Sequence, residues 1–149
     1  MIEDYVSFEN AKLLKEKGFD EECYRFWQYD KANNKDDTDG ISLSECNVYL
    51  PLCNSKIDYL FKDKLMSSGY SAPTLQMAMK WLRENHNLYI TSVPNGIGEN
   101  VFYMSIYRKY DYGWTHISDC LDEEYKEAEF SSPEEACDAA IKYCLEKLI

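Results

Sequence analysis

Two alternating segments joined by a glycine-containing loop constrain the fold most. Residues 87–93 read NLYITSV, residues 100–110 read NVFYMSIYRKY, and PNGIGE separates them. Alternation of apolar and polar residues is the period of a half-buried strand, and Asn-Gly between two such runs favours a tight turn. The two segments therefore predict an antiparallel β-hairpin.

The second segment also predicts which side of the hairpin is buried. Phe102, Met104 and Ile106 share one face, and Tyr103, Ser105 and Tyr107 share the other. We expect the first face to join the core and the second to be partly exposed. A further strand around 112–118, with Gly113 in the turn, would extend the meander.

The N-terminal half begins with a helix signal and continues with two extended segments. Ser7 is a suitable N-cap for a helix over 8–17, and Gly18 suits the left-handed position after its end. The aromatic segment 23–29 predicts a strand, and CNVYL at 46–50 predicts a second one that ends at a proline.

Three further segments have helical periodicity. Apolar residues recur from Ser55 to Leu65, which predicts a short helix. Residues 73–87 carry a proline in the first turn and an apolar stripe, which predicts a longer one. The C-terminal helix begins with a capping box, Ser132 to Glu135, and has an apolar stripe to the end of the sequence.

These elements indicate an α+β fold in two layers. We expect an antiparallel sheet of about four to five strands with three or four helices packed on one face. The length of 149 residues fits one domain, 1–149, with an exposed acidic loop at about 30–45.

The charge is strongly acidic but unevenly distributed. The net charge is −11, whereas residues 71–110 contain only two acidic residues and four basic ones. An acidic molecule is repelled by nucleic acid and by anionic membranes. No apolar run has the length of a membrane span, and the first residues do not resemble a signal peptide, so we expect a cytoplasmic protein.

The acidic loop resembles a calcium-binding EF-hand loop but does not satisfy its pattern. With Gly40 at position 6, Lys35 falls at position 1 and Cys46 at position 12, so two ligands are lost. With Glu45 at position 12, the glycine lies at position 7. We therefore expect a solvated loop and no calcium site.

Other metal and cofactor motifs are also missing from the sequence. The six cysteines form no C-x-x-C pair, and His86 and His116 are the only histidines. Cys137 and Cys144 are seven residues apart and share one face of the C-terminal helix, which indicates buried thiols. We expect free thiols, no metal site and no cofactor.

The sequence gives little support to catalysis. It contains no nucleophile elbow, P-loop or dinucleotide-binding glycine pattern. His116, near Asp119 and Cys120, is the one position where a Cys/His/Asp grouping can be imagined. We assign no catalytic residue, and an enzyme built around His116 and Cys120 is the weakest of our hypotheses.

A polar stripe on the helix at 73–87 marks the candidate binding face. Gln76, Lys80, Arg83 and Asn87 recur at helical spacing, and Tyr103 and Tyr107 lie on the exposed face of the hairpin. A helix followed by a hairpin (88–109) also resembles the recognition helix and wing of a winged-helix domain. The helix carries only two basic residues and the wing loop PNGIGE carries none, which argues against nucleic-acid binding.

Three segments resemble a known group of proteins. YVSFENAKLLKEKGFD (5–20), YSAPTLQMAMKWLRENHNLYI (70–90) and SPEEACDAAIKYCLEKLI (132–149) are similar to a family of small uncharacterised proteins encoded by phages, prophages and mobile elements of gut anaerobic bacteria. The resemblance implies one intracellular domain and no particular activity. Residues 30–69 do not match the family pattern.

Together these observations favour a non-enzymatic accessory module that binds another protein. A second copy of the chain is one such partner, through an aromatic sheet face or the hairpin. The alternative is a nucleic-acid-associated module that uses the 73–87 helix and the 88–109 hairpin.

Overall fold

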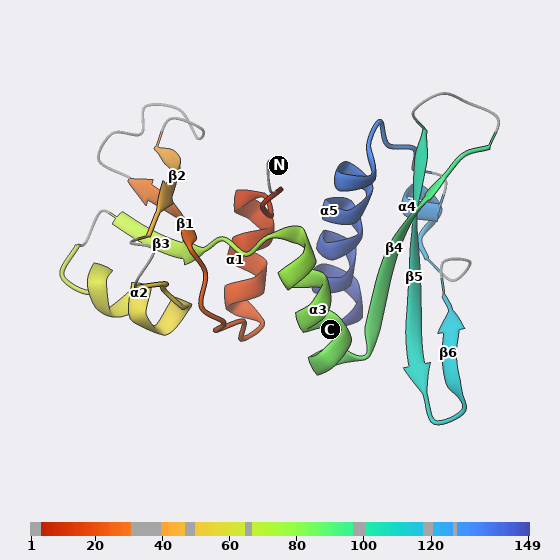
Figure 1. Ribbon diagram of the computed structural model, residues 1–149, viewed down its shortest axis with the longest axis horizontal. Coiled ribbons are helices and arrows are strands. Elements are labelled where there is room, and N and C mark those ends of the chain that lie inside the picture. The colour runs from red at the N-terminus through yellow and green to blue at the C-terminus, as the bar shows by residue number, and fades with distance from the viewer. Residues whose placement is uncertain are drawn as a thin grey trace. The chain divides into compact units, whose positions relative to one another are not determined.

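The computed structural model describes residues 4–30, 40–46, 50–64, 67–96, 101–117, 121–126 and 128–149. The chain divides into two compact units (Figure 1). The N-terminal unit is Tyr5–Thr74, and the C-terminal unit is Leu75–Ile149 together with Asp4. Whether residues 1–149 form one domain stays a prediction, because the compactness of each unit does not tell whether either folds alone.

The fold class is α+β, as expected, but the strands form two sheets and not one. Each sheet is three-stranded and antiparallel, with the orders β2-β1-β3 and β4-β5-β6. The prediction of a single sheet of four to five strands is therefore wrong. Periodicity identifies a strand from its own residues, whereas the choice of partner depends on contacts far apart in the chain.

The N-terminal unit contains two helices and one sheet. In chain order its elements are α1 (Phe8–Glu16), β1 (Arg25–Asp30), β2 (Ile41–Glu45), α2 (Asn54–Phe61) and β3 (Ser67–Ser71). The predicted caps of α1 are confirmed: the Ser7 side chain accepts a hydrogen bond from the Asn10 N–H at 3.3 Å, and Gly18 has a φ of 94°.

The two helices of this unit contact opposite faces of its sheet. The Phe8 ring of α1 lies 6.1 Å from Trp27 and 5.6 Å from Tyr70, centroid to centroid. Phe61 of α2 lies 6.3 Å from Phe26, whose side chain points to the other side of β1. The expectation that all helices pack on one face is thus wrong for this unit.

Two strands of this sheet differ from expectation. β2 lies at 41–45, inside the segment expected to be an acidic loop, and Arg25 pairs with Glu45 across the ladder. Of the strand expected at 46–50, Cys46 and Leu50 are not in a strand, and residues 47–49 lie outside the described residues. β3 was missed because SSGYS has no apolar alternation; its pairing with β1 forms it instead.

A buried asparagine connects the start of α2 to two other segments. The Asn54 amide nitrogen donates to the Phe19 carbonyl oxygen at 2.7 Å, and its Oδ1 accepts from the Ser71 N–H at 2.9 Å. Asn54 is 5% exposed, so both bonds are protected from water. Asp20 caps the same helix from outside, because its carboxylate accepts from the Ser55 N–H, and these bonds to Ser55 lower the pKa of Asp20.

The C-terminal unit contains the longer helices and the predicted hairpin. Its elements are α3 (Leu75–His86), β4 (Leu88–Pro94), β5 (Phe102–Tyr110), β6 (Gly113–His116), the single turn α4 (Glu123–Lys126), α5 (Pro133–Tyr143) and a π-helical turn at Cys144–Leu148. The capping box of α5 is present in part: Ser132 Oγ accepts from the Glu135 N–H at 3.1 Å, while the Glu135 carboxylate accepts from Ser131.

Helices α3 and α5 pack on one face of the β4-β5-β6 sheet (Figure 1). The predicted core face of β5 is confirmed for Met104 and Ile106, which are buried, whereas Phe102 is half-buried; Ile90 lies opposite Ile106 on β4. The apolar stripe of α5 covers this face; its buried members are Ala136, Ala140 and Ile141. The other face of the sheet carries the tyrosines.

Gly69 of β3 gives a direct test of the packing in the N-terminal unit. A Cβ at position 69 would lie 2.5 Å from Ile57 Cγ2 and 2.9 Å from a Phe61 ring carbon. We expect Gly69→Ala to lower the free energy of unfolding by about 1 to 3 kcal/mol, because the added methyl displaces two side chains of α2. Urea unfolding followed by circular dichroism measures the change.

Gly96→Ala is the matched control, because a Cβ there meets no atom within 4 Å. We expect it to change stability by less than about 0.5 kcal/mol. Equal unfolding midpoints for the two variants would show that α2 does not pack against Gly69 as described.

Candidate functional site

Strand β4 lies at an edge of the C-terminal sheet, and in the part of the chain that the structure describes no strand pairs with its outer side. The Lys109 N–H donates to the Asn87 carbonyl at 2.9 Å, and the Asn95 N–H donates to the Val101 carbonyl at 2.7 Å. In an antiparallel ladder every second residue exchanges such bonds with its partner strand. Counting between these two bonds, Tyr89, Thr91 and Val93 point their N–H and C=O groups at β5, so those of Ile90 and Ser92 point away from it.

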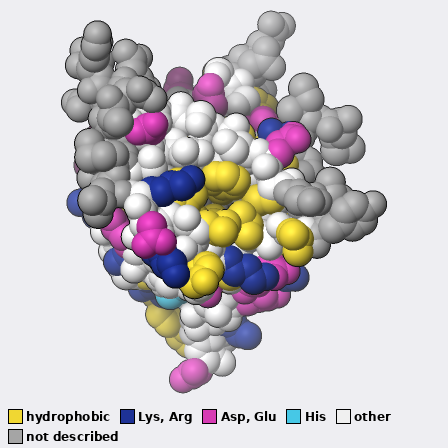
Figure 2. All heavy atoms as spheres, turned by 90° about the vertical axis from the view of Figure 1, so that its left-hand side faces the viewer, with side chains coloured by type: hydrophobic (Ala, Val, Ile, Leu, Met, Phe, Trp, Pro, Cys, Tyr) yellow, Lys and Arg dark blue, Asp and Glu magenta, His cyan; other side chains and the backbone are white. Residues whose placement is uncertain are grey.

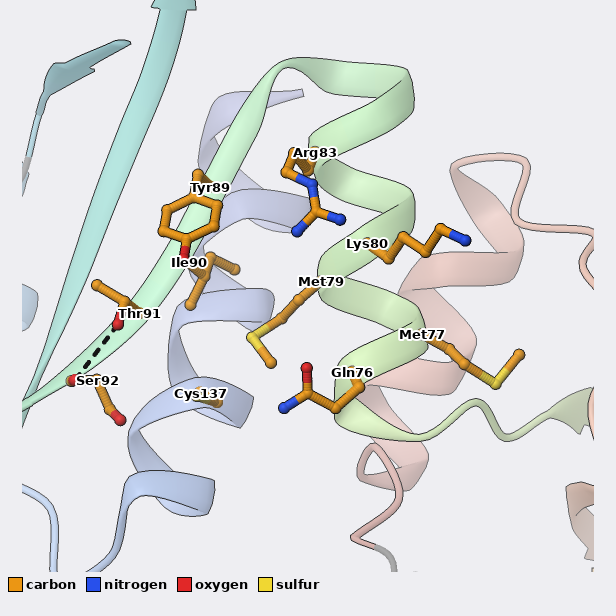
Figure 3. Close-up of a pocket in the computed structure, with 10 residues that line it drawn as sticks. All are labelled: Gln76, Met77, Met79, Lys80, Arg83, Tyr89, Ile90, Thr91, Ser92 and Cys137. Atoms are coloured by element: carbon orange, nitrogen blue, oxygen red, sulfur yellow. Dashed lines mark hydrogen bonds between the residues drawn. The ribbon is translucent and has the colours of Figure 1, made fainter.

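A groove runs beside this edge, between α3 and β4. Its volume is about 460 Å³, and Cys137 of α5 contributes to its lining. Figure 3 shows Gln76, Met79 and Arg83 extending from α3 toward β4 and α5, whereas Lys80 turns the other way. The groove therefore combines a polar amide, one guanidinium group and a thioether with the backbone of a strand edge.

The structure brings only part of the predicted stripe on α3 into this groove. Gln76, Lys80 and Arg83 line it, although the Lys80 side chain is largely exposed and its Nζ is 3.9 Å from Glu84 Oε1. Asn87 ends α3 in the left-handed region, with a φ of 56°, and its carbonyl begins the β4–β5 ladder. The stripe is therefore not a continuous basic face.

The outer face of the sheet carries a row of aromatic side chains. Tyr89, Tyr107 and His116 are neighbours across the three strands, with ring centroids 6.1 Å apart for the tyrosines and 4.9 Å apart for Tyr107 and His116. Trp114 lies 6.1 Å from Tyr89. Tyr89 is 42% exposed and Trp114 is 45% exposed, so much of this row faces water.

A second hollow, of about 530 Å³, lies over this aromatic row. Arg83, Tyr89, Thr91, Tyr107 and Trp114 line it. Because Arg83, Tyr89 and Thr91 line the groove as well, the two hollows meet along β4. We call the groove and the outer aromatic face together the Arg83 surface.

Of the two predicted tyrosines, Tyr107 lies in the Arg83 surface and Tyr103 lies beyond the lining of both hollows. The Tyr103 hydroxyl donates to Glu129 Oε1 at 3.1 Å and accepts from Asn95 Nδ2 at 3.3 Å. The bond to Glu129 raises the pKa of Tyr103, because the carboxylate is a better partner for the protonated phenol.

Sequence reasoning missed Tyr89, Ser92, Trp114 and Cys137 as part of the surface. The alternation of NLYITSV could have placed Tyr89 and Thr91 on the side of Tyr107, once the register of the hairpin was assumed. No sequence signal places Cys137 beside β4, since that contact depends on how α5 packs.

His116 does not form the grouping expected for an enzyme within the described residues. Its Nε2 lies 2.9 Å from Ser105 Oγ on the outer face of the sheet, and Asp119 and Cys120 lie outside the described residues. Ser105 is 8% exposed and lies in the central strand, whose two edges are both paired. Backbone N–H groups that a catalytic serine would need for an oxyanion are therefore committed to the ladders.

The cysteines that the structure describes are free thiols: Cys23, Cys46, Cys53, Cys137 and Cys144. Burial raises the pKa of Cys23 and of Cys144 to about 12, so both thiols are protonated at neutral pH. Burial also raises the pKa of Cys137, against an opposing hydrogen bond with Ser92. No group of three or more potential metal ligands occurs in the described ranges.

The loop compared with an EF-hand spans 34–46, and its residues 34–39 lie outside the described residues. The flanking residues that the structure describes belong to a β-ladder: the Asp30 N–H donates to the Gly40 carbonyl at 2.9 Å. The Glu45 carboxylate accepts from Arg25 at 2.6 Å. Both flanks are strands, whereas an EF-hand loop joins two helices.

The N-terminal unit has an exposed apolar patch on α2. Tyr59 is 68% exposed and Leu60 is 55% exposed, and both line a shallow hollow with Leu52 and Lys56. Figure 2 faces the side on which α2 and β2 lie, and shows hydrophobic side chains gathered beside lysine and arginine side chains. Among the described residues, Ser55, Lys56 and the Tyr59 hydroxyl supply the only polar side-chain groups in its lining, so it offers little specificity.

Labelling of Ser105 tests the enzyme hypothesis. We expect a fluorophosphonate probe to leave Ser105 unmodified, because the hydroxyl is buried and faces no free N–H pair. Intact-mass spectrometry after incubation measures the adduct. An adduct on Ser105 in the wild-type chain that is absent from His116→Ala would contradict this and identify a reactive Ser–His pair.

Among the described residues, no helix is long and apolar enough to cross a membrane. Comparisons with protein-family models, with curated protein sequences and with solved structures found no match. The resemblance to phage and mobile-element proteins therefore stays a prediction.

Proposed function

We propose that this chain is a non-enzymatic accessory module that binds another protein through the Arg83 surface. The observation that carries the proposal is the exposure of Tyr89 and Trp114 beside Arg83 in one continuous surface. Tryptophan, tyrosine and arginine are the residues that most often contribute strongly to protein interfaces.

The exposed parts of these rings contribute little to the stability of the free protein, because folding does not remove them from water. The other face of the same sheet is covered by α3 and α5, whereas Tyr89 and Trp114 leave more than a third of their surfaces to water. Burial of apolar surface contributes roughly 25 cal/mol per Å². A partner that covers the rings would recover that free energy on binding.

The charges of the surface and of the chain support a selective interface. The chain has a net charge of −11, yet the hollow over the aromatic row is lined by Arg83 and by no acidic residue. Interfaces use such local complementarity to choose a partner and to fix its orientation. A cytoplasmic partner and an origin in a phage or mobile element, as the sequence resemblance implies, belong to the same proposal.

Trp114→Ala combined with Tyr89→Ala tests the proposal. We expect the double variant to lose at least about tenfold of the partner captured by the tagged chain from an extract of its source organism, because both exposed rings are removed. Quantitative mass spectrometry of the captured proteins measures the loss, and sedimentation velocity of the chain alone tests whether the partner is a second copy.

Tyr112→Ala is the matched control for this experiment. Tyr112 is 80% exposed and stacks on Tyr110 in the β5–β6 turn. The substitution therefore removes an exposed ring that lies outside the lining of the Arg83 surface. Equal capture by all three proteins, or a loss shared by the control, would rule out this surface as the interface.

A nucleic acid is the second candidate partner, and one observation favours it. Arg83 lies beside two exposed rings, and aromatic rings with a neighbouring cation bind unpaired bases by stacking. Against this, Lys80 lies close to Glu84 and the chain as a whole is acidic.

We expect a fluorescent single-stranded oligonucleotide to show no binding by anisotropy at physiological salt. The acidic chain repels phosphates, and Arg83 alone neutralises one of them. Salt-dependent binding that is lost in Arg83→Gln but retained in Lys147→Gln, an exposed lysine that lines neither hollow, would replace protein binding by nucleic-acid binding as the function.

A further inference from the structure

We propose that the free edge of β4 accepts an extended, acidic segment of a partner protein as a fourth strand of the β4-β5-β6 sheet. This inference rests on the proposed protein-binding function and names the occupant of the groove. In this arrangement the segment pairs with the backbone of β4 in the groove, and its side chains also contact the neighbouring aromatic face.

The backbone of β4 offers the hydrogen-bonding groups for such pairing. The N–H and C=O groups of Ile90 point away from β5, as does the Ser92 N–H. Thr91 donates to the Ser92 carbonyl at 3.4 Å, a long bond that a peptide donor can replace. An open edge of this kind is the template on which an extended peptide adds to a sheet.

Pro94 limits the open edge to a short stretch. Pro94 lies two residues after Ser92, so its nitrogen points to the open edge, as the N–H groups of Ile90 and Ser92 do. The proline therefore interrupts pairing on the open edge and does not remove a hydrogen bond to β5. The peptide would therefore pair along Ile90 and Ser92, where the groove lies, and not along the whole strand.

The groove walls suit the alternating side chains of an added strand. Successive residues of a strand point to opposite faces of the sheet. On the core side the groove offers Met79, Ile90 and Cys137, which suit an apolar residue. On the outer side lie Tyr89 and Thr91, next to the aromatic row.

Arg83 determines the charge of the segment. It lines both hollows, and it forms no salt bridge with any residue that the structure describes. In a chain with 27 acidic residues, an arginine in two hollows whose described lining contains no acidic residue favours a carboxylate on the ligand. We therefore expect an aspartate or glutamate next to the paired residues.

A second copy of the chain fits this edge less well. Symmetric pairing of two identical edges brings the same groove of each copy together. Arg83 of one copy would then face a groove that also contains an arginine, without a carboxylate to balance either. Charge complementarity thus favours an acidic segment of a different protein.

Selection from a random peptide library displayed on phage, with the full-length chain as bait, tests the inference. We expect the enriched peptides to contain an acidic residue within an alternating apolar pattern. Synthetic versions of these peptides then serve as probes for measuring dissociation constants by fluorescence anisotropy.

Two pairs of variants separate edge pairing from other modes of binding. Ser92→Pro and Ser92→Ala both remove the hydroxyl, but only the proline removes the N–H on the open edge. We expect binding to weaken by about tenfold or more in Ser92→Pro and by much less in Ser92→Ala. Arg83→Gln should weaken binding, whereas Lys147→Gln, which changes an exposed lysine of the same unit that lines neither hollow, should not.

A measurement on the wild-type chain keeps the test decisive if Ser92→Pro does not fold. Addition of a selected peptide to the ¹⁵N-labelled chain should shift the backbone amide signals of Ile90 and Ser92 and slow their hydrogen exchange. Peptides that bind but shift only residues of the aromatic face would overturn edge pairing and leave the proposed function standing. A library that yields no binding peptide would overturn the inference, while the capture experiment with Trp114 and Tyr89 still tests protein binding.

Discussion

The ladder between β4 and β5 determines most of what the C-terminal unit offers to a partner. Asn87 and Asn95 fix which residues of β4 are hydrogen-bonded to β5, and every other backbone group on that strand points to the open edge. The same register decides which side chains face α3 and α5 and which join the aromatic row. A shift by one residue would exchange the two faces and bury Tyr89 in place of Ile90.

The turn at Asn87 makes this arrangement compact. It ends α3 with a positive φ and starts β4 at the next residue, so helix and strand lie side by side without a loop between them. Arg83, one turn before the end of α3, therefore reaches both the groove and the aromatic face. The Arg83 guanidinium group thus lines two neighbouring hollows, one beside the edge of β4 and one over the aromatic side chains.

Local sequence signals predicted the elements that depend on neighbouring residues. The caps at Ser7 and Ser132 and the buried face of β5 follow from short-range rules, and the structure has them. Strand β3 could not be predicted in this way, because Gly69 is required by the contact with α2 and not by strand propensity.

The candidate site shows the same division between local and long-range information. Arg83 and Tyr107 were identified from spacing, while Lys80 shares that spacing but lines only the groove, with its amine near Glu84. Helical periodicity places a residue on a face but does not tell what packs against that face. The groove exists because α3, β4 and α5 meet, and that packing involves residues about fifty positions apart.

Hydrogen exchange along β4 in the free chain tests the central claim most directly. If the edge is open, the amides of Tyr89 and Thr91 exchange slowly and those of Ile90 and Ser92 exchange fast, so that protection alternates along the strand. Equal protection of all four amides would mean that the edge is already covered, and would contradict the account of the groove as a binding site.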